Sequence, residues 1–313
     1  MKKKLCMLFA CTGVALAPWL EGFAAQAPDI DIRIWPEIGD PADIDYAFVW
    51  KPPTGVFAGL PNLRAIFSLG AGIETLLTPG LLPDSVPLVR MVDPGLAVGM
   101  NEFVVMRVLH YHRRMHEHAA FQAEAVWMPL VPKLPEDRVV GIMGLGQLGG
   151  LCARTLVSFG FPLRGWSRTQ RQIDGVQTFH GQHGLAPFLQ DTEILVCLLP
   201  LTQDTSGLVN GHLLSQLPRG ACLINTARGA HVVDTDLLSA IESGQIGAAT
   251  LDVFMQEPLP PSHPYWAHPK VTVVPHCSAI TQPKTAIRTL LSNLRCHDAG
   301  GMLENQVDLA RGY

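Results

Sequence analysis

Three polar residues in the second half of the chain have side chains suited to binding an acid and transferring a proton. Arg228, Glu257 and His276 each follow a short apolar run. A guanidinium binds a carboxylate through two hydrogen bonds and polarises a neighbouring carbonyl oxygen. A histidine gives a proton near neutral pH, and a carboxylate beside it orients the ring and favours its charged form. Singly, the three also fit a surface turn, a helix end and an ordinary rim histidine, so the prediction depends on their occurring together.

A glycine motif supplies the second half of this chemistry. Gly144, Gly146 and Gly149 follow the apolar run Val139 to Met143 and precede a helical stretch. In such a turn the first glycine permits the bend, the second lets a pyrophosphate approach the backbone, and the third lets the helix pack on the strand. The predicted helix, Leu148 to Phe159, would hold the pyrophosphate at its N-terminus. A dinucleotide site with the three polar residues behind it predicts reduction of a 2-keto acid.

The residues after the next strand predict which dinucleotide binds. An NAD-selective fold places Asp or Glu about 20 residues past the glycines, where it accepts from the ribose hydroxyl. Here Ser167 and Arg168 follow the run Leu163 to Trp166, without a carboxylate. Because Arg168 can pair with a 2′-phosphate, we predict that NADPH is preferred over NADH. A solvated turn is the alternative reading of these residues.

Short apolar runs alternate with helical stretches along the whole chain, which is the pattern of a doubly wound parallel sheet. Ligands of such sheets bind at the carboxyl ends of the strands, where the polar residues above lie. We predict two α/β domains of this kind. A nucleotide-binding Rossmann domain over residues 99–282 is inserted into a flavodoxin-like substrate domain made of residues 1–98 and 283–313. The turn Gly70-Ala71-Gly72 in the latter domain offers backbone N–H groups to an anion, or is an ordinary turn.

The N-terminal stretch permits two interpretations. Lys2 to Lys4 followed by Leu5 to Leu20 is similar to a secretory signal, with Ala15-Leu16-Ala17 as a cleavage site. Alternatively, Lys4 to Cys11 is the first strand and Gly13 to Ala25 the first helix. We favour the strand, because cleavage would remove an element that the following segments need. A cytoplasmic protein is therefore expected.

Composition narrows the class of protein. Hydrophobic residues make up 48% of the 313-residue chain, charged residues make up 16%, and the net charge is −4. The absence of a basic run beyond Lys4 argues against nucleic acid as a partner, and Pro18 interrupts the N-terminal apolar stretch, which disfavours a membrane span. The seven cysteines are scattered without a C-x-x-C pattern, so neither disulfides nor zinc is predicted. His110, His112, His116 and His118 are expected to be solvated or at an interface rather than to bind a metal.

The order of these motifs resembles the D-isomer-specific 2-hydroxyacid dehydrogenase family over nearly the whole chain. The segments that carry the resemblance are the glycine motif, Leu198 to Thr202, Asn225 to Gly229, Leu251 to Leu259, and Pro275-His276. Within the family, Ala47 to Pro53, Phe67 to Gly72 and Gln306 to Tyr313 are most similar to the bacterial glyoxylate/hydroxypyruvate reductase A group.

This resemblance implies a role for each site residue. Arg228 binds and polarises the keto acid, His276 donates the proton and Glu257 is its partner. Trp50, Ala71 and Gly72 are implied to contact the substrate, together with Arg228 and His276. Glu74 departs from the family, where aspartate commonly follows the glycine turn. The complete set of cofactor candidates is Gly144, Gly146, Gln147, Leu148, Gly149, Ser167, Arg168, Leu199, Pro200, Thr205, Thr226, Ala227 and Asp252.

The family also implies a homodimer built through the nucleotide-binding domains, with the segment near Trp127 reaching the other subunit. Two other functions stay open. A nicotinamide-sensing binding protein would keep the fold without turnover, although an intact set of Arg228, Glu257 and His276 argues against it. A phosphoglycerate dehydrogenase is disfavoured by the absence of an added regulatory domain and of a basic cluster for a phosphate. The preference between glyoxylate and hydroxypyruvate is left open.

Overall fold

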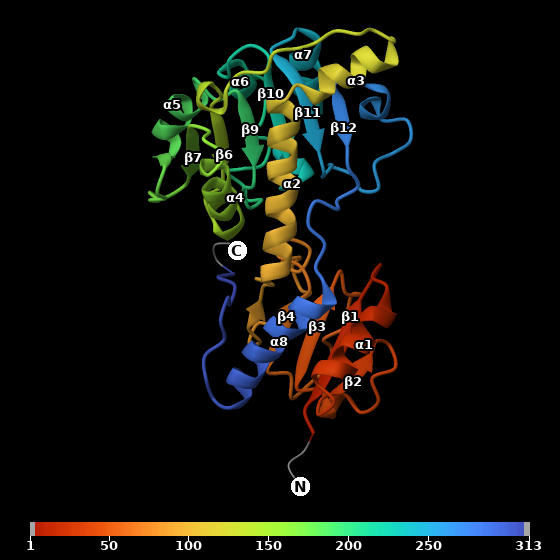
Figure 1. The fold of residues 1–313 in the computed structure, drawn as a ribbon. Helices are drawn as coiled ribbons and strands as arrows, with labels where there is room; N and C mark the ends of the chain where they lie inside the picture. The colour runs from red at the N-terminus through yellow and green to blue at the C-terminus, as the bar shows by residue number, and fades with distance from the viewer. Residues whose placement is uncertain (1–3, 310–313) are drawn as a thin grey trace. The chain divides into compact units, whose positions relative to one another are not determined.

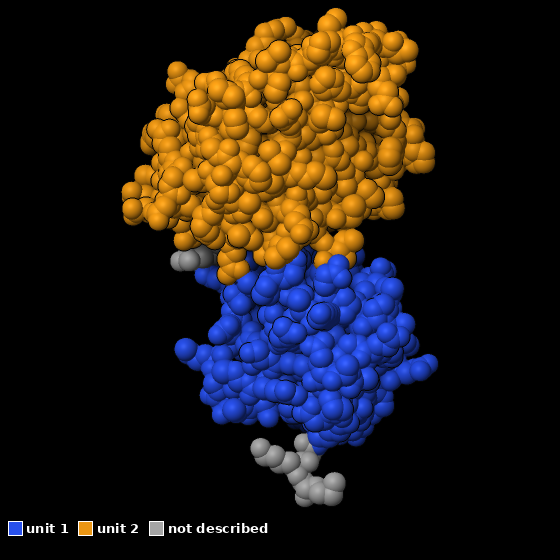
Figure 2. Space-filling view, viewed as in Figure 1, with its two compact units in different colours: residues 1–96, 281–313 blue, residues 97–280 orange. Residues whose placement is uncertain are grey.

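The computed structural model describes residues 4–309 and contains two parallel sheets (Figure 1). The chain divides into two compact units, shown in blue and orange in Figure 2. Unit 1 comprises residues 1–96 and 281–313, and unit 2 comprises residues 97–280. These boundaries lie within two residues of those expected from the sequence. Part of the terminal motif Gln306 to Tyr313 falls at residues 310–313, outside the described residues.

Unit 1 contains a five-stranded sheet in the order β2-β1-β3-β4-β5, with every pairing parallel. This order is that of the flavodoxin-like fold. Helix α8 (Pro283–Asp298) packs on α1 (Leu16–Gln26), and the side chain of Ile287 lies against Gly22. The strands are β1 (Cys6–Cys11), β2 (Asp31–Ile34), β3 (Tyr46–Trp50), β4 (Ala65–Ser68) and β5 (Leu88–Val89).

Strand β1 lies between β2 and β3, and its side chains enter two separate cores. Met7 and Phe9 pack in one hydrophobic cluster, whereas Leu8 and Ala10 pack in the other. A strand buried on both faces needs an uninterrupted apolar run, which explains the composition of the N-terminal stretch. The prediction that this N-terminal stretch forms a strand followed by a helix is therefore confirmed.

Unit 2 contains a seven-stranded parallel sheet in the order β12-β11-β10-β9-β6-β7-β8. The order reverses at β6, as in the Rossmann fold, so the predicted pair of doubly wound α/β domains is confirmed. The strands are β6 (Val140–Met143), β7 (Leu163–Ser167), β8 (Val176–His180), β9 (Ile194–Cys197), β10 (Ala221–Asn225), β11 (Ile246–Leu251) and β12 (Val271–Val273). The helices are α2 (Pro94–His112), which begins at the end of unit 1, α3 (Met115–Ala123), α4 (Gln147–Val157), α5 (Leu185–Leu189), α6 (Gly211–Ser215) and α7 (Asp234–Glu242).

Two local features differ from what the sequence predicts. The spacing of apolar residues predicts one helix from Asn101 to Ala120, and this prediction is wrong because Arg114 adopts a φ of +59° between α2 and α3. Strand β8 was not anticipated, because it lies at the edge of the sheet and alternates polar with apolar residues instead of forming an apolar run. In residues 4–309 no helix has both the length and the apolar character needed to cross a bilayer.

Candidate active site

The glycine turn between β6 and α4 has the geometry of a phosphate-binding loop. Gly144 has a φ of +101°, and a Cβ there would lie 2.5 Å from the carbonyl oxygen of Leu198. A Cβ on Gly149 would overlap the carbonyl oxygen of Gly144, so close packing of α4 requires this glycine. A Cβ on Gly146 would meet nothing within 4 Å. The two outer glycines are therefore needed for packing, while the middle one leaves space at the helix N-terminus that fits a pyrophosphate.

The next cofactor candidates follow the carboxyl ends of the neighbouring strands β6 and β7. Gln147 and Leu148 open α4. Ser167 ends β7 and is buried, and its hydroxyl donates to the carbonyl oxygen of Thr169 at 2.8 Å. Arg168 follows as an exposed residue. The end of β7 therefore carries a hydroxyl and a guanidinium, and residues 163–169 include no Asp or Glu.

The loop after β9 is held by a threonine. Thr205 is buried, its Oγ1 donates to the carbonyl oxygen of Pro200 at 2.8 Å, and it accepts from the N–H of Thr202 at 2.8 Å. Leu199 is buried beside them. The Thr205 hydroxyl thus shapes the loop through internal hydrogen bonds, while its contact with a cofactor stays a prediction.

Arg228 follows β10 in a loop that is fixed by Asn225. The side chain of Asn225 accepts from Ala227 N at 3.1 Å and donates to Arg228 O at 3.0 Å. Arg228 is half-buried. Thr226 is buried, and among residues 4–309 its Oγ1 has no hydrogen-bond partner. An unpartnered buried hydroxyl costs free energy unless a ligand satisfies it, so this atom also fits a bound polar group.

His276 and Glu257 form a close pair after β12 and β11. The Nδ1 atom of His276 lies 2.7 Å from Glu257 Oε2, and the other carboxylate oxygen accepts from Phe254 N at 3.1 Å. The carboxylate is therefore held from both sides and orients the ring. Because Nδ1 faces the carboxylate, Nε2 is the nitrogen that remains for proton donation, and the His276 side chain is 43% exposed.

Asp252 fixes the backbone on both sides of His276. Its Oδ1 accepts from Cys277 N at 2.8 Å and from Ser278 N at 3.1 Å, and its Oδ2 accepts from the Ser278 hydroxyl at 2.5 Å. The carbonyl oxygen of Asp252 accepts from His276 N at 2.8 Å, and His276 adopts a φ of +51°. Complete burial raises the pKa of Asp252, and the hydrogen bonds from Ser278 and Cys277 act in the opposite direction. Sequence reasoning assigned this residue to the cofactor and missed its role in holding the histidine loop.

The loops that carry Arg228, Glu257 and His276 come from the neighbouring strands β10, β11 and β12. Gly229 lies so close to the carbonyl group of Phe254 that a Cβ would overlap it. The loops after β10 and β11 are therefore in contact. Sequence reasoning gave no role to Asn225, His231 or Ser278, although a polar residue such as Asn225 at the end of an apolar run is a recognisable signal.

The substrate candidates Trp50, Ala71 and Gly72 belong to unit 1. The indole ring of Trp50 covers Gly70, where a Cβ would overlap it. The carbonyl oxygen of Gly70 accepts from the Ser68 hydroxyl at 2.9 Å. This turn is therefore fixed by its own neighbours, while the contact of these residues with a substrate stays a prediction.

Of the four histidines in α2 and α3, His112 is buried, so the expectation of a solvated or interface position was wrong for this residue, and His110 and His116 also pack against other rings. The ring of His112 is buried against Phe161 with centroids 4.9 Å apart, and that of His116 lies 5.2 Å from Tyr111. Burial lowers the pKa of His110, His112 and His116. In the part of the chain that the structure describes, no three potential ligands are grouped as a metal would need.

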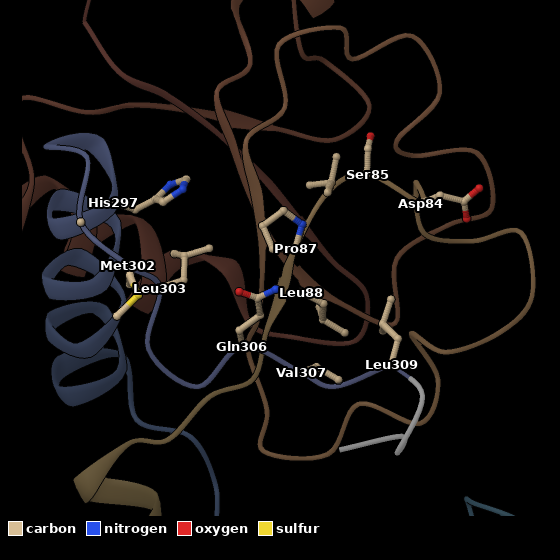
Figure 3. A pocket seen from close by; sticks show the side chains of 12 residues that line it. Asp84, Ser85, Pro87, Leu88, His297, Met302, Leu303, Gln306, Val307 and Leu309 are labelled. Carbon is tan, nitrogen blue, oxygen red and sulfur yellow. The ribbon is translucent and has the colours of Figure 1, made fainter.

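Unit 1 has an open hollow of about 490 Å³ beside β5 and the segment Gly301 to Leu309. Figure 3 shows the side chains that line it. Its lining mixes apolar side chains with Asp84, His297 and Gln306. None of the residues predicted to bind substrate or cofactor lines it.

Comparison with known proteins gives consistent matches. Residues 105–278 match the family model described as D-isomer specific 2-hydroxyacid dehydrogenase, NAD binding domain. A protein of Yersinia enterocolitica named glyoxylate/hydroxypyruvate reductase A is 46% identical over 300 residues, which cover 94% of this chain and 96% of the relative.

Two solved structures are similar over nearly their whole length. A D-isomer specific 2-hydroxyacid dehydrogenase from Xanthobacter autotrophicus, in complex with NADPH and MES, superposes with a TM-score of 0.95 at 42% identity, covering 99% of this chain and 100% of that one. An NADPH-dependent glyoxylate/hydroxypyruvate reductase from Sinorhizobium meliloti, in complex with NADP and sulfate, gives 0.92 at 37% identity with the same coverage.

Proposed function

Because the chain belongs to the D-isomer-specific 2-hydroxyacid dehydrogenase family, we propose that it reduces glyoxylate to glycolate and hydroxypyruvate to D-glycerate with NADPH. The names of the relatives and the ligands of the two similar structures support the substrate class and the cofactor.

The residues of this chain fit the cofactor. The space over Gly146 would receive the pyrophosphate, and the unpartnered hydroxyl of Thr226 would accept or donate a hydrogen bond on the nicotinamide side. Arg168 and Ser167 would bind a 2′-phosphate, since the end of β7 carries no carboxylate to repel it. When bound, NADPH supplies the hydride that reduces the keto carbon.

The chain's own residues supply the other requirements of the reaction. Arg228 binds the keto acid and stabilises the negative charge that develops on the keto oxygen. His276 gives the proton from Nε2 to that oxygen, while Glu257 holds the ring through Nδ1 and stabilises its charged form. Asp252 keeps the histidine loop in place through four hydrogen bonds from residues 276–278.

The observation that supports this mechanism best is the 2.7 Å contact between His276 and Glu257 in the loops after β12 and β11. The test is oxidation of NADPH followed by absorbance over a panel of small 2-keto acids. We expect turnover with glyoxylate and hydroxypyruvate. Tight NADPH binding without turnover on any acid would instead favour a cofactor-sensing binding protein.

The variant Arg228→Lys tests, in the same assay, whether Arg228 binds the substrate. Lysine keeps the charge but lacks the planar fork, so we expect a higher KM for the keto acid together with a lower kcat. Unchanged values of both constants would remove Arg228 from the mechanism.

We further propose that the protein is a homodimer that buries the segment between α3 and β6. This segment exposes large apolar side chains, with Trp127 98% and Val131 87% exposed. Isolated exposed apolar residues are common, but a run of them is typical of a surface covered by a partner.

The proposed location is the cytoplasm. All seven cysteines are free, and the N-terminal apolar stretch is used as the buried strand β1. Mass spectrometry of protein from the native host should find a chain that begins at or near Met1 in the cytosolic fraction. A chain starting at or after residue 18 in a periplasmic fraction would contradict this assignment.

A further inference from the structure

His231 is a completely buried titratable side chain to which the proposed reaction gives no role. It ends the short helix η4 (Gly229–His231), three residues after Arg228. Its Nδ1 lies 3.2 Å from Arg228 N, and its Nε2 lies 3.3 Å from the carbonyl oxygen of Pro200. The ring therefore stands between the backbone of the substrate-binding arginine and the loop after β9.

The surrounding groups select one state of the imidazole. The Arg228 N–H requires an acceptor, which is Nδ1, and the Pro200 carbonyl requires a donor, which is Nε2–H. Nδ1 also lies 3.1 Å from Arg228 O, but that oxygen already accepts from the Asn225 side chain at 3.0 Å and from His231 N at 3.2 Å, which occupies both of its lone pairs. The neutral Nε2–H tautomer satisfies every one of these atoms, whereas an added proton on Nδ1 would face the Arg228 N–H.

The two loops are also joined by backbone hydrogen bonds that do not involve the imidazole. Gly207 N donates to Ala230 O and Val209 N donates to His231 O, both at 2.8 Å. The Pro200 carbonyl additionally accepts from Thr205 Oγ1. Loss of the ring would therefore leave the loops paired while leaving the Arg228 N–H without its acceptor.

We propose that neutral His231 is a positioning residue, which fixes the backbone of Arg228 through Nδ1 and the cofactor-side loop through Nε2. The proposal rests on the proposed function, because it assigns Arg228 to the keto acid and the loop at Pro200 to NADPH. The two ring nitrogens consequently have separable effects on the two substrates.

A pair of substitutions separates them. His231→Asn places an amide where Nδ1 lies and keeps an acceptor for Arg228 N, but it does not reach Pro200. His231→Gln places an amide near Nε2 and keeps the donor to Pro200, but it abandons Arg228. We expect His231→Gln to lower kcat/KM for glyoxylate by roughly 10-fold or more, the scale of small misplacements of a binding group. His231→Asn should lower kcat/KM for glyoxylate less than His231→Gln does, and it should raise the KM for NADPH more.

Equal effects of both variants on both substrates, or no effect of either, would overturn the proposal. A purely structural role would lower Tm in both variants without separating the two KM values. If neither variant folds, nitrogen chemical shifts of His231 in the wild-type protein decide, because a charged ring or an Nδ1–H tautomer would overturn the assignment. A wild-type protein that reduces no 2-keto acid would contradict the proposed function instead, and it would leave the predicted tautomer to the same spectra.

Discussion

At the scale of single residues, the His276 ring is held from one side only. Glu257 engages Nδ1, and the carboxylate is itself fixed by Phe254 N. We propose that the proton leaves from Nε2, while Nδ1 keeps its contact with the Glu257 carboxylate. This arrangement makes the roles of the two residues separable by substitution.

The first prediction concerns this pair. His276→Ala should lower kcat by roughly 10²-fold or more, the usual effect of losing a general acid. Glu257→Gln removes the carboxylate that orients the ring through Nδ1, so kcat should also fall, by less than in His276→Ala. Both are measured as kcat with saturating NADPH. Near-normal turnover of His276→Ala would refute the assigned proton donor.

Cofactor choice is also decided by single residues. Arg168 follows Ser167, the last residue of β7, and Arg168→Asp would place a negative charge where a 2′-phosphate is proposed to bind. The wild type should favour NADPH over NADH by kcat/KM, and the variant should lose most of that preference. Arg171→Asp, three residues further along the chain and also exposed, is the control. Equal use of both cofactors by the wild type would contradict the assignment.

At the scale of elements, the turn from β6 to α4 separates folding from ligand binding. Gly149 is needed for packing against Gly144, whereas the space around Gly146 is open. The two glycines belong to one motif, yet a methyl group added at each should have different consequences.

Gly149→Ala should lower the free energy of unfolding by about 1–3 kcal/mol, because the added methyl group overlaps the backbone. Gly146 has a φ of −73°, which alanine adopts readily. The Tm of Gly146→Ala should therefore be unchanged, while its affinity for NADPH falls. Thermal unfolding and titration of NADPH by fluorescence measure the two effects. Wild-type affinity in Gly146→Ala would show that no pyrophosphate approaches this position.

The elements that the sequence predicted are those whose pattern follows from burial. Strands such as β1 and β6 are buried on both faces, and this requires apolar runs that are visible without a structure. Strand β8 escaped prediction because an edge strand needs no such run. The same distinction holds in the site, where Arg228, Glu257 and His276 are recognisable because each follows an apolar run in the sequence. The hydrogen bonds of Asp252 and His231 link different loops, and no local pattern encodes such links.

At the scale of the whole molecule, the proposed association of two copies depends on the exposed apolar segment between α3 and β6. Trp127→Ser combined with Val131→Ser should shift the protein from dimer to monomer in size-exclusion chromatography with light scattering. The physical reason is the loss of apolar area from a segment that the proposed partner covers. Trp266→Ser, at a half-exposed tryptophan elsewhere in unit 2, is the matched control. A wild type that is monomeric at micromolar concentration would refute the homodimer.

The division of unit 1 into two separate stretches also governs how the protein is made. Ribosomes release residues 1–96 first, then all of unit 2, and only afterwards the helix α8, whose Ile287, Leu290 and Leu294 complete the core around Trp19 and Phe23. At about 5–20 residues per second, residues 97–280 take roughly 10 to 40 seconds to synthesise. During this interval one apolar face of the nascent first sheet is covered by α1 but not by α8, while unit 2 is contiguous and can fold as it emerges. A chaperone that binds the nascent chain should therefore bind residues 1–96, and it should dissociate once α8 has been synthesised and has packed on them.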